Sequence, residues 1–281
     1  MLDVTSESPL TELLNIVKSR TVLVITGAGI STASGIPDYR DANGVRRGRA
    51  PMMHQEFVSS AQARRRYWAR SMRGWPTVRQ AQPNAAHHAL AHLEAKHRIS
   101  RLITQNVDAL HEQAGSHRVI ELHGNLHRVV CLDCGKCQRR EDIQAILESE
   151  NAYLQEADII LAPDGDAQLA EHYLNAFRMP ACPCCGSEML KPDVVFFGDG
   201  VPTHQADAAT RSVQEAEALL VIGTSLMTYS SFRLCQQAHR EGKPIMAINL
   251  GKTRADALLT LKVESHCEDV LPRVVEQWVN A

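Results

Sequence analysis

Short apolar runs recur along the chain, and each is followed by a turn that carries glycine or polar residues. Such runs occupy Thr21–Thr26, Ile99–Thr104, Arg118–Leu122, Leu219–Ile222 and Pro244–Ile248. Strands that are apolar at successive positions are typical of a parallel sheet, because both of its faces are covered. The pattern therefore predicts a buried parallel sheet.

Segments with helical spacing of apolar residues lie between and around these runs. Ser8 is suited to cap a helix that begins at Pro9, and Asn84 is suited to cap another. The apolar stripes comprise Leu10, Leu13, Leu14 and Val17, then Ala86, Leu90 and Leu93, and finally Leu271, Val274, Val275 and Trp278. His87, His88, His92 and His97 show no ordered set of partners, so we expect them on the surface.

The composition narrows the possible classes of protein. A chain of 281 residues with 44% hydrophobic content can form one large domain with an insertion. The net charge of −2 gives no general attraction to nucleic acid. No apolar or arginine-rich leader is seen, and no apolar run approaches the roughly 18 residues of a membrane span. We therefore expect a cytoplasmic protein without a membrane segment.

The first apolar run leads directly into Gly27-Ala28-Gly29. Glycines at the end of a strand allow a tight turn and close approach to a pyrophosphate, which the N–H groups of a following helix would face. A complete dinucleotide fingerprint needs a third glycine at position 32, where this chain has Thr32. This departure disfavours a hydride-transfer dehydrogenase, and a plain strand-to-helix turn is the alternative.

Two Cys-x-x-Cys pairs give the most specific chemical signal in the chain. Cys131 with Cys134 and Cys182 with Cys185 can complete a closed tetrahedral site of the kind that holds structural zinc. A catalytic zinc would need an open position. Cys137 and Cys184 are spare thiols in this interpretation, and a redox pair is the alternative.

The sequence GAGIS followed by GIPDYR resembles the sirtuins, which are NAD-dependent protein deacylases, and the resemblance continues through nearly all of the chain. Most members carry Phe at the position of Tyr39. The resemblance implies that this loop closes over NAD, with Ile36 and Asp38 facing the nicotinamide. The NAD-binding residues it implies here are Gly27, Ala28, Gly29, Ile30, Ser31, Thr32, Ile36, Pro37, Asp38, Tyr39 and Arg40.

Further matches to the family follow later apolar runs. Gln105 would bind the nicotinamide ribose, while Asn106 and Asp108 would place nicotinamide and an ordered water; helix capping is the alternative. His123 matches the catalytic histidine, and imidazole can accept a proton from a ribose hydroxyl near neutral pH. The adenosine side would be contacted by Gly223, Thr224, Ser225, Asn249, Leu250, Gly251 and the backbone of Cys267.

A substrate peptide is implied by the segment Lys191–Gly198. In the family this segment pairs with an extended peptide through backbone groups, here Val195, Phe196, Phe197 and Gly198. An ordinary core strand is the alternative. Asp199 stands where Glu is common in the family.

The segments RRRYWAR, GWP and APDGD look like the class II branch, which includes a mitochondrial sirtuin. Tyr67 and Arg70 lie three positions apart, so a phenol and a guanidinium could converge on one carboxylate. We therefore predict a preference for acyl chains that end in a carboxylate or another polar group. The alternative is a solvated helical face, because the segment 41–80 also carries Arg46, Arg47, Arg49, Arg64, Arg65, Arg66, Arg73 and Arg79.

We expect a doubly wound parallel, Rossmann-like α/β fold with a smaller helical and zinc-binding domain inserted. Residues 1–40, 81–125 and 191–281 would form the NAD-binding domain, and 41–80 with 126–190 the small domain. NAD and the acylated peptide would enter between the two parts. The segment 138–179 has no assigned role.

The resemblance implies that the acyl-lysine oxygen attacks the nicotinamide ribose and releases nicotinamide, and that His123 then deprotonates a ribose hydroxyl. The products would be free lysine and acyl-ADP-ribose. A mono-ADP-ribosyltransferase, a lipoamidase and a non-enzymatic zinc and nucleic-acid module are the alternatives. The sequence names neither the acyl group, the target proteins nor the oligomeric state.

Overall fold

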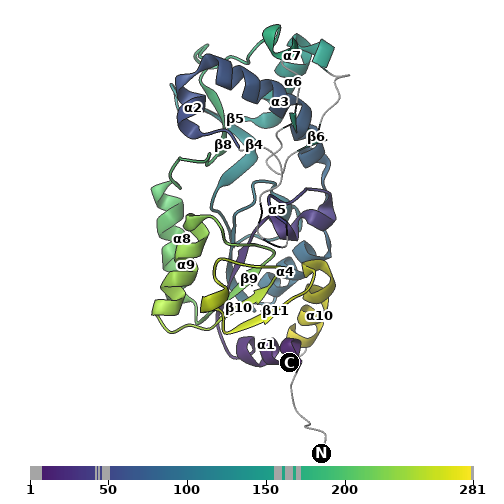
Figure 1. Cartoon of the computed structure of the whole chain (residues 1–281), viewed down its shortest axis with the longest axis vertical. Coiled ribbons are helices and arrows are strands. Elements are labelled where there is room, and N and C mark those ends of the chain that lie inside the picture. The colour runs from purple at the N-terminus through teal and green to yellow at the C-terminus, as the bar shows by residue number, and fades with distance from the viewer. Residues whose placement is uncertain are drawn as a thin grey trace, which may run out of the picture.

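The computed structural model describes residues 8–41, 43, 45, 51–154, 160–161, 167–168 and 172–279. Figure 1 shows an elongated molecule, with a parallel sheet and its helices at the lower end and a smaller sheet with α2, α3 and α6 at the upper end. Arg46, Arg47, Arg49 and the APDGD segment lie outside the described residues. Within the described part, no helix is long and apolar enough to cross a membrane.

The larger sheet has six strands in the order β11-β10-β9-β1-β2-β3. Every neighbouring pair is parallel. The strands are β1 Val22–Thr26, β2 Ile99–Thr104, β3 Val119–Glu121, β9 Ala218–Ile222, β10 Ile245–Ile248 and β11 Leu261–Val263. The predicted parallel sheet is confirmed. The edge strand β11 was not predicted, because Lys262 interrupts its short apolar run.

Helices cover both faces of this sheet (Figure 1). One apolar core joins the sheet to α1 Pro9–Val17, α4 Ala85–Ala95 and α10 Cys267–Val279, and a second joins it to α8 Thr203–Glu215 and α9 Tyr229–Arg240. The predicted caps are confirmed: the Ser8 hydroxyl accepts from the N–H of Thr11, and the Asn84 side chain accepts from the N–H of Ala86. The doubly wound fold is therefore confirmed.

The sheet reverses its strand order between β1 and β9. The chain runs outward from β1 through β2 to β3, and after the small sheet it returns to β9 on the other side of β1. A crevice at the carboxyl ends of the strands is the usual ligand site at such a reversal. The turns after Thr26 and Ile222 lie at this point.

Two local predictions are corrected. The segment after Gly27 forms two short 3-10 turns, Ala28–Ile30 and Thr32–Ser34, so the N-terminus of an α-helix does not face this turn. His87, which was expected on the surface, is buried. Its Nδ1 accepts from the N–H of Asn84 in a capping box, and its ring packs on that of His111 with the centroids 4.8 Å apart. His88, His92 and His97 are exposed as predicted.

The smaller part is built on an antiparallel sheet in the order β5-β4-β8. Its strands are β4 Gly124–Cys131, β5 Cys137–Arg139 and β8 Leu190–Val194, and its helices are α2 His54–Ser59, α3 Ala61–Gln80, α6 Arg140–Glu150 and α7 His172–Asn175. The remaining described elements are α5 Leu110–Gln113, the 3-10 turns Ala152–Leu154 and Asp256–Leu258, and the strand pair β6 Ile160–Leu161 with β7 Ala167–Gln168. The division at residues 40, 80, 125 and 190 stays a prediction.

Helices α3 and α6 are held together in this smaller part by buried Arg140. Its guanidinium lies over the rings of Trp68 and Trp75, 5.3 and 4.9 Å from their centroids. Its Nη2 donates to the backbone and hydroxyl oxygens of Ser71. The guanidinium therefore cross-links α6 to three successive turns of α3.

Candidate active site

A cavity of about 1150 Å³ lies at the carboxyl ends of the parallel strands and extends to β8 of the smaller sheet. This volume is at the large end for a ligand site, so the cavity has room for a dinucleotide and part of a second substrate. The predicted site residues that line it are Ala28, Gly29, Ser31, Thr32, Ile36, Pro37, Asp38, Tyr39, Arg40, Tyr67, Gln105, Asn106, Asp108, His123, Val195, Phe196, Phe197, Gly198, Gly223, Thr224, Ser225, Asn249, Leu250 and Cys267.

Four of the residues predicted to bind NAD or substrate, Gly27, Ile30, Gly251 and Arg70, are not among the lining residues in the described part of the chain. Gly27 and Ile30 belong to the turn beneath the cavity, and Ile30 is fully buried in the core. Tyr67 reaches the wall of the cavity, but its ring packs among aromatic rings. Its ring centroid lies 5.5 Å from that of Phe57 and 5.3 Å from that of Phe196. Tyr67 and Arg70 therefore do not share the cavity surface.

The floor of the cavity is a close contact between the turns after β1 and β9. The N–H of Gly29 donates to the carbonyl of Gly223 at 2.8 Å. A Cβ at Gly29 would lie 2.8 Å from that carbonyl oxygen, and a Cβ at Gly223, whose φ is +58°, would lie 2.5 Å from the Ile30 nitrogen. Glycine is required at both positions because backbone approaches backbone.

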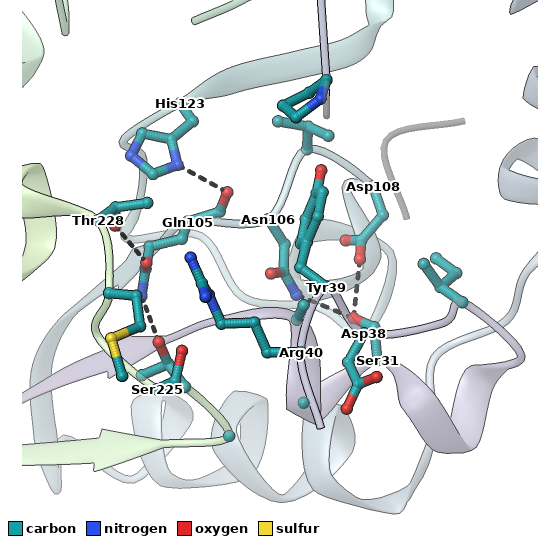
Figure 2. Close-up of a pocket in the computed structure, with 18 of the residues that line it drawn as sticks. Ser31, Asp38, Tyr39, Arg40, Gln105, Asn106, Asp108, His123, Ser225 and Thr228 are labelled. Carbon is teal, nitrogen blue, oxygen red and sulfur yellow. Dashed lines mark hydrogen bonds between the residues drawn. The ribbon is translucent and has the colours of Figure 1, made fainter. Parts of the chain in front are cut away.

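Gln105 organises the left side of the site in Figure 2. Its side-chain Nε2 donates to the Thr224 hydroxyl at 2.9 Å. Its Oε1 accepts from the hydroxyls of Thr228 at 2.9 Å and Ser231 at 3.0 Å. These bonds tie the turn after β2 to the turn after β9 and to the start of α9, so the Gln105 amide is fixed in orientation.

His123 follows β3 and faces the cavity beside Gln105 (Figure 2). Its Nδ1 lies 3.1 Å from the Gln105 carbonyl oxygen, and its Nε2 lies 2.8 Å from the Ser230 hydroxyl. Burial lowers the pKa of His123, which the hydrogen bond to the Gln105 backbone partly offsets. The imidazole is therefore neutral at physiological pH and available as a base.

The opposite wall carries a buried network around Ser31. The Ser31 hydroxyl donates to Asp108 Oδ2 at 2.7 Å and accepts from the Asn106 amide at 2.9 Å, as Figure 2 shows. His87 Nε2 lies 3.5 Å from the same hydroxyl. Burial lowers the pKa of His87 to about 4 and raises the pKa of Asp108, whose hydrogen bonds to the Leu110 N–H and Ser31 oppose that rise.

Capping accounts for part of the Asp108 geometry. Its Oδ1 accepts from the N–H of Leu110 at 3.0 Å, at the start of α5. The other carboxyl oxygen, Oδ2, bonds to Ser31 across the cavity wall. The residue therefore combines the local role considered from the sequence with a contact that only the fold creates.

The predicted peptide segment continues from β8 along the edge of the cavity. The N–H of Val195 donates to the carbonyl of His123 at 2.8 Å, and the carbonyl of Phe197 accepts from the N–H of His54 at 2.9 Å. Phe196 packs inward on Phe57 and Tyr67, whereas Phe197 is exposed. The segment thus joins His123, which follows β3, to helix α2.

Several lining residues were missed by the sequence analysis. Thr228, Tyr229, Ser230 and Arg233 from the start of α9 line the cavity, as do Val107 and Leu126. A run of hydroxyl residues, Thr228 to Ser231, is visible in the sequence, but only the fold brings α9 beside His123.

The four predicted metal ligands converge in the smaller part. The sulfurs of Cys131, Cys134, Cys182 and Cys185 all lie within 4.8 Å of one another, with Cys131 and Cys185 at 3.6 Å and Cys134 and Cys182 at 3.8 Å. Tetrahedral coordination with Zn–S bonds of about 2.3 Å requires sulfurs about 3.8 Å apart. The cluster therefore fits a closed zinc site, and Cys137 and Cys184 are exposed outside it.

Comparisons with known proteins agree with this geometry. The family model described as "Sir2 family" matches residues 27–230 of this chain. The chain is 56% identical over 279 residues to "NAD-dependent protein deacetylase 3" of Pseudomonas syringae pv. tomato, covering 99% of both chains. It is 50% identical over 256 residues to "NAD-dependent protein deacetylase 2" of Bradyrhizobium diazoefficiens, covering 91% of this chain and 93% of that one.

Solved structures show the same fold. The structure "Sir2-p53 peptide-NAD+" superposes with a TM-score of 0.79 at 32% identity and covers 97% of this chain and 99% of that one. "Structure of Sir2Tm bound to a propionylated peptide" gives a TM-score of 0.76 at 33% identity over 95% and 98% of the two chains. The chain therefore belongs to the Sir2, or sirtuin, family.

Proposed function

We propose that this protein is an NAD-dependent protein-lysine deacylase that transfers the acyl group of a modified lysine to ADP-ribose and releases nicotinamide. The observation that carries the proposal is the placement of His123 and the Ser31–Asn106–Asp108 network on opposite walls of one cavity. The named activity of the bacterial relatives, protein deacetylation with NAD, supports the same reaction.

NAD fits the residues that line the cavity. The glycine turns after β1 and β9 line the cavity at the strand-order reversal, where dinucleotides bind in open sheets. Asn249, Leu250 and Cys267 line the part of the cavity near β10 and α10, where the adenosine side would lie. When bound, NAD supplies the ribose carbon that takes up the acyl oxygen as nicotinamide departs.

Residues on the two walls of the cavity would have different roles in the reaction. Asn106, Asp108 and Ser31 would hold the nicotinamide amide, because their polar atoms are already ordered by mutual hydrogen bonds. His123 would accept a proton from a ribose hydroxyl at its side-chain nitrogen. The Ile36–Arg40 loop lines the same cavity and would exclude water from the reacting centre.

A structural zinc ion held by Cys131, Cys134, Cys182 and Cys185 would fix the end of β4 against the start of β8. A structural role is consistent with the lining of the cavity, which includes none of the four cysteines. A closed four-thiolate site stabilises structure and leaves no position for substrate.

We also propose that the chain lies in the class II branch and prefers acyl chains with a polar end. The support is the sequence RRRYWAR and the position of Tyr67 at the cavity wall. Arg70 would have to turn toward a bound carboxylate, since it is outside the lining residues of the described chain.

Incubation with NAD and a panel of acyl-lysine peptides tests the function. Deacylation lowers the peptide mass by the acyl group and produces acyl-ADP-ribose. Mono-ADP-ribosyl transfer would raise the protein mass instead, and lipoamidase activity would be confined to lipoyl-lysine. A non-enzymatic nucleic-acid module would produce neither change; the described arginines Arg64, Arg66 and Arg79 are used in contacts between helices.

A further inference from the structure

The protonation of the His123 ring can be assigned from its two partners. A carbonyl oxygen can only accept a hydrogen bond, so the Nδ1 that lies 3.1 Å from the Gln105 carbonyl must carry the proton. The ring is neutral, and its Nε2 therefore bears the free lone pair. The Ser230 hydroxyl, 2.8 Å away, donates to that lone pair.

The reactive nitrogen of the base is thus already engaged by a side chain of the protein. We propose that Ser230 is a positioning residue for His123, and this inference rests on the proposed deacylase function. Ser230 holds the imidazole with Nε2 aimed into the cavity before the ribose hydroxyl arrives.

Gln105, which binds the Nδ1 side of the His123 ring, also holds the helix turn that carries Ser230. It is the second residue of α9, whose first turn is bound through the Thr228 and Ser231 hydroxyls to Gln105 Oε1. The Gln105 carbonyl accepts from His123 Nδ1. Both nitrogens of the imidazole are therefore fixed by one hydrogen-bonded frame that joins β2 to α9.

The hydroxyl can serve both protonation states of the ring. The ribose hydroxyl first displaces the Ser230 O–H from the Nε2 lone pair, which breaks that hydrogen bond. When the ribose hydroxyl then transfers its proton, the ribose O–H bond breaks and an N–H bond forms at Nε2, while Ser230 keeps its own proton. The Ser230 hydroxyl then turns and accepts from Nε2–H, because a hydroxyl has one donor and two acceptor lone pairs. A hydrogen bond to the charged ring is stronger than one to the neutral ring, so the contact favours proton transfer.

Three variants test this inference. Ser230→Ala removes the hydroxyl, Ser230→Thr keeps it, and Ser212→Ala removes a buried hydroxyl that donates within its own helix, to the Ala208 carbonyl. We expect Ser230→Ala to lower kcat for deacylation about tenfold, with KM for NAD and peptide within about twofold of wild type. Ser230→Thr should stay near the wild-type rate, and Ser212→Ala should equal it.

Nicotinamide exchange into NAD gives a second measurement on the same proteins. Exchange precedes the proton transfer to His123 in the proposed reaction, so Ser230→Ala should keep the wild-type exchange rate while its deacylation rate falls. Wild-type kcat in Ser230→Ala, or equal losses in the Ala and Thr variants, would overturn the positioning role. Failure of the proposed function is distinguishable, because wild-type protein would then produce no deacylated peptide.

Discussion

Gly29 and Gly223 touch through their backbones, and the N–H of Gly29 donates to the Gly223 carbonyl at 2.8 Å. This contact joins the turns after the first and ninth strands at the reversal of strand order. It sets the floor of the cavity, so the shape of the candidate NAD site depends on the absence of two side chains.

Gly29→Ala should destabilise the protein and weaken NAD binding. The new Cβ would lie 2.8 Å from a carbonyl oxygen, and relief requires the two turns to separate. Overpacking of this kind costs about 1–3 kcal/mol. Thermal unfolding and NAD titration measure the two effects.

Gly200→Ala is the matched control, because a Cβ there meets nothing within 4 Å and Gly200 does not line the cavity. It should unfold as the wild type does. Equal stability of Gly29→Ala and Gly200→Ala would show that the contact does not constrain the turns.

Asp108→Asn should stabilise the fold at neutral pH. Burial raises the pKa of Asp108, so the folded state resists its ionisation more than the unfolded chain does. Stability is therefore lost as pH rises from about 4, the ordinary carboxyl pKa, through the raised value. The amide keeps an acceptor for the Leu110 N–H, and we expect a higher Tm than that of the wild type at pH 7.

The pH dependence of the Tm difference distinguishes the ionisation of Asp108 from a change in packing as the cause of the stabilisation. The Tm difference between variant and wild type should grow from pH 4 to pH 7, since the buried histidines are common to both proteins. A constant difference, or a less stable variant at pH 7, would refute the assigned origin.

Cys131→Ser and Cys185→Ser should each lose the bound zinc, and neither variant should then show a cooperative unfolding transition. The four sulfurs hold two chain segments in one cluster, so loss of one ligand releases both. Metal analysis and thermal unfolding are the measurements. Cys137→Ser, at an exposed thiol outside the cluster, should retain both properties; a metal-free wild type with unchanged melting would argue against a structural zinc.

Arg70→Met should lower catalytic efficiency on succinyl-lysine peptides by roughly ten- to hundredfold and spare acetyl-lysine peptides. A charge-assisted hydrogen bond to a carboxylate contributes about 1.5–3 kcal/mol. Arg66→Met is the control on the same helix, because Arg66 pairs with Glu56. Equal losses of catalytic efficiency on succinyl-lysine and acetyl-lysine peptides would show that Arg70 supports the fold and does not bind the acyl carboxylate.

The sequence was sufficient for features that depend on neighbours along the chain. Strand β1, the Ser8 and Asn84 caps and the two cysteine pairs were predicted because propensity, capping and ligand spacing are local. The family resemblance led to the cavity residues, and their individual roles stay predictions.

Features set by contacts across the fold could not be predicted in this way. His87 is buried because α4 packs against Ser31 and His111, which lie far from it in sequence. Ser230 meets His123 only because β9 returns beside β1 and sets α9 above the strand ends. Neither contact has a local sequence signal.

His123→Ala should abolish deacylation while the protein stays folded. The imidazole lines the cavity and bonds to Gln105 and Ser230, so its removal leaves the apolar cores intact. General-base catalysis contributes about 10²–10⁴ in rate. Activity on an acetyl-lysine peptide with unfolding as the control measures this, and wild-type turnover would remove His123 from the reaction.

The central claim is that NAD is consumed as the acyl group leaves lysine. The most direct measurement is the amount of nicotinamide and of deacylated peptide formed by wild-type protein from NAD and an acetyl-lysine peptide. We predict equimolar amounts of the two products, together with acetyl-ADP-ribose and no deacylation without NAD. Deacylation without nicotinamide release, or NADH formation in its place, would contradict the account.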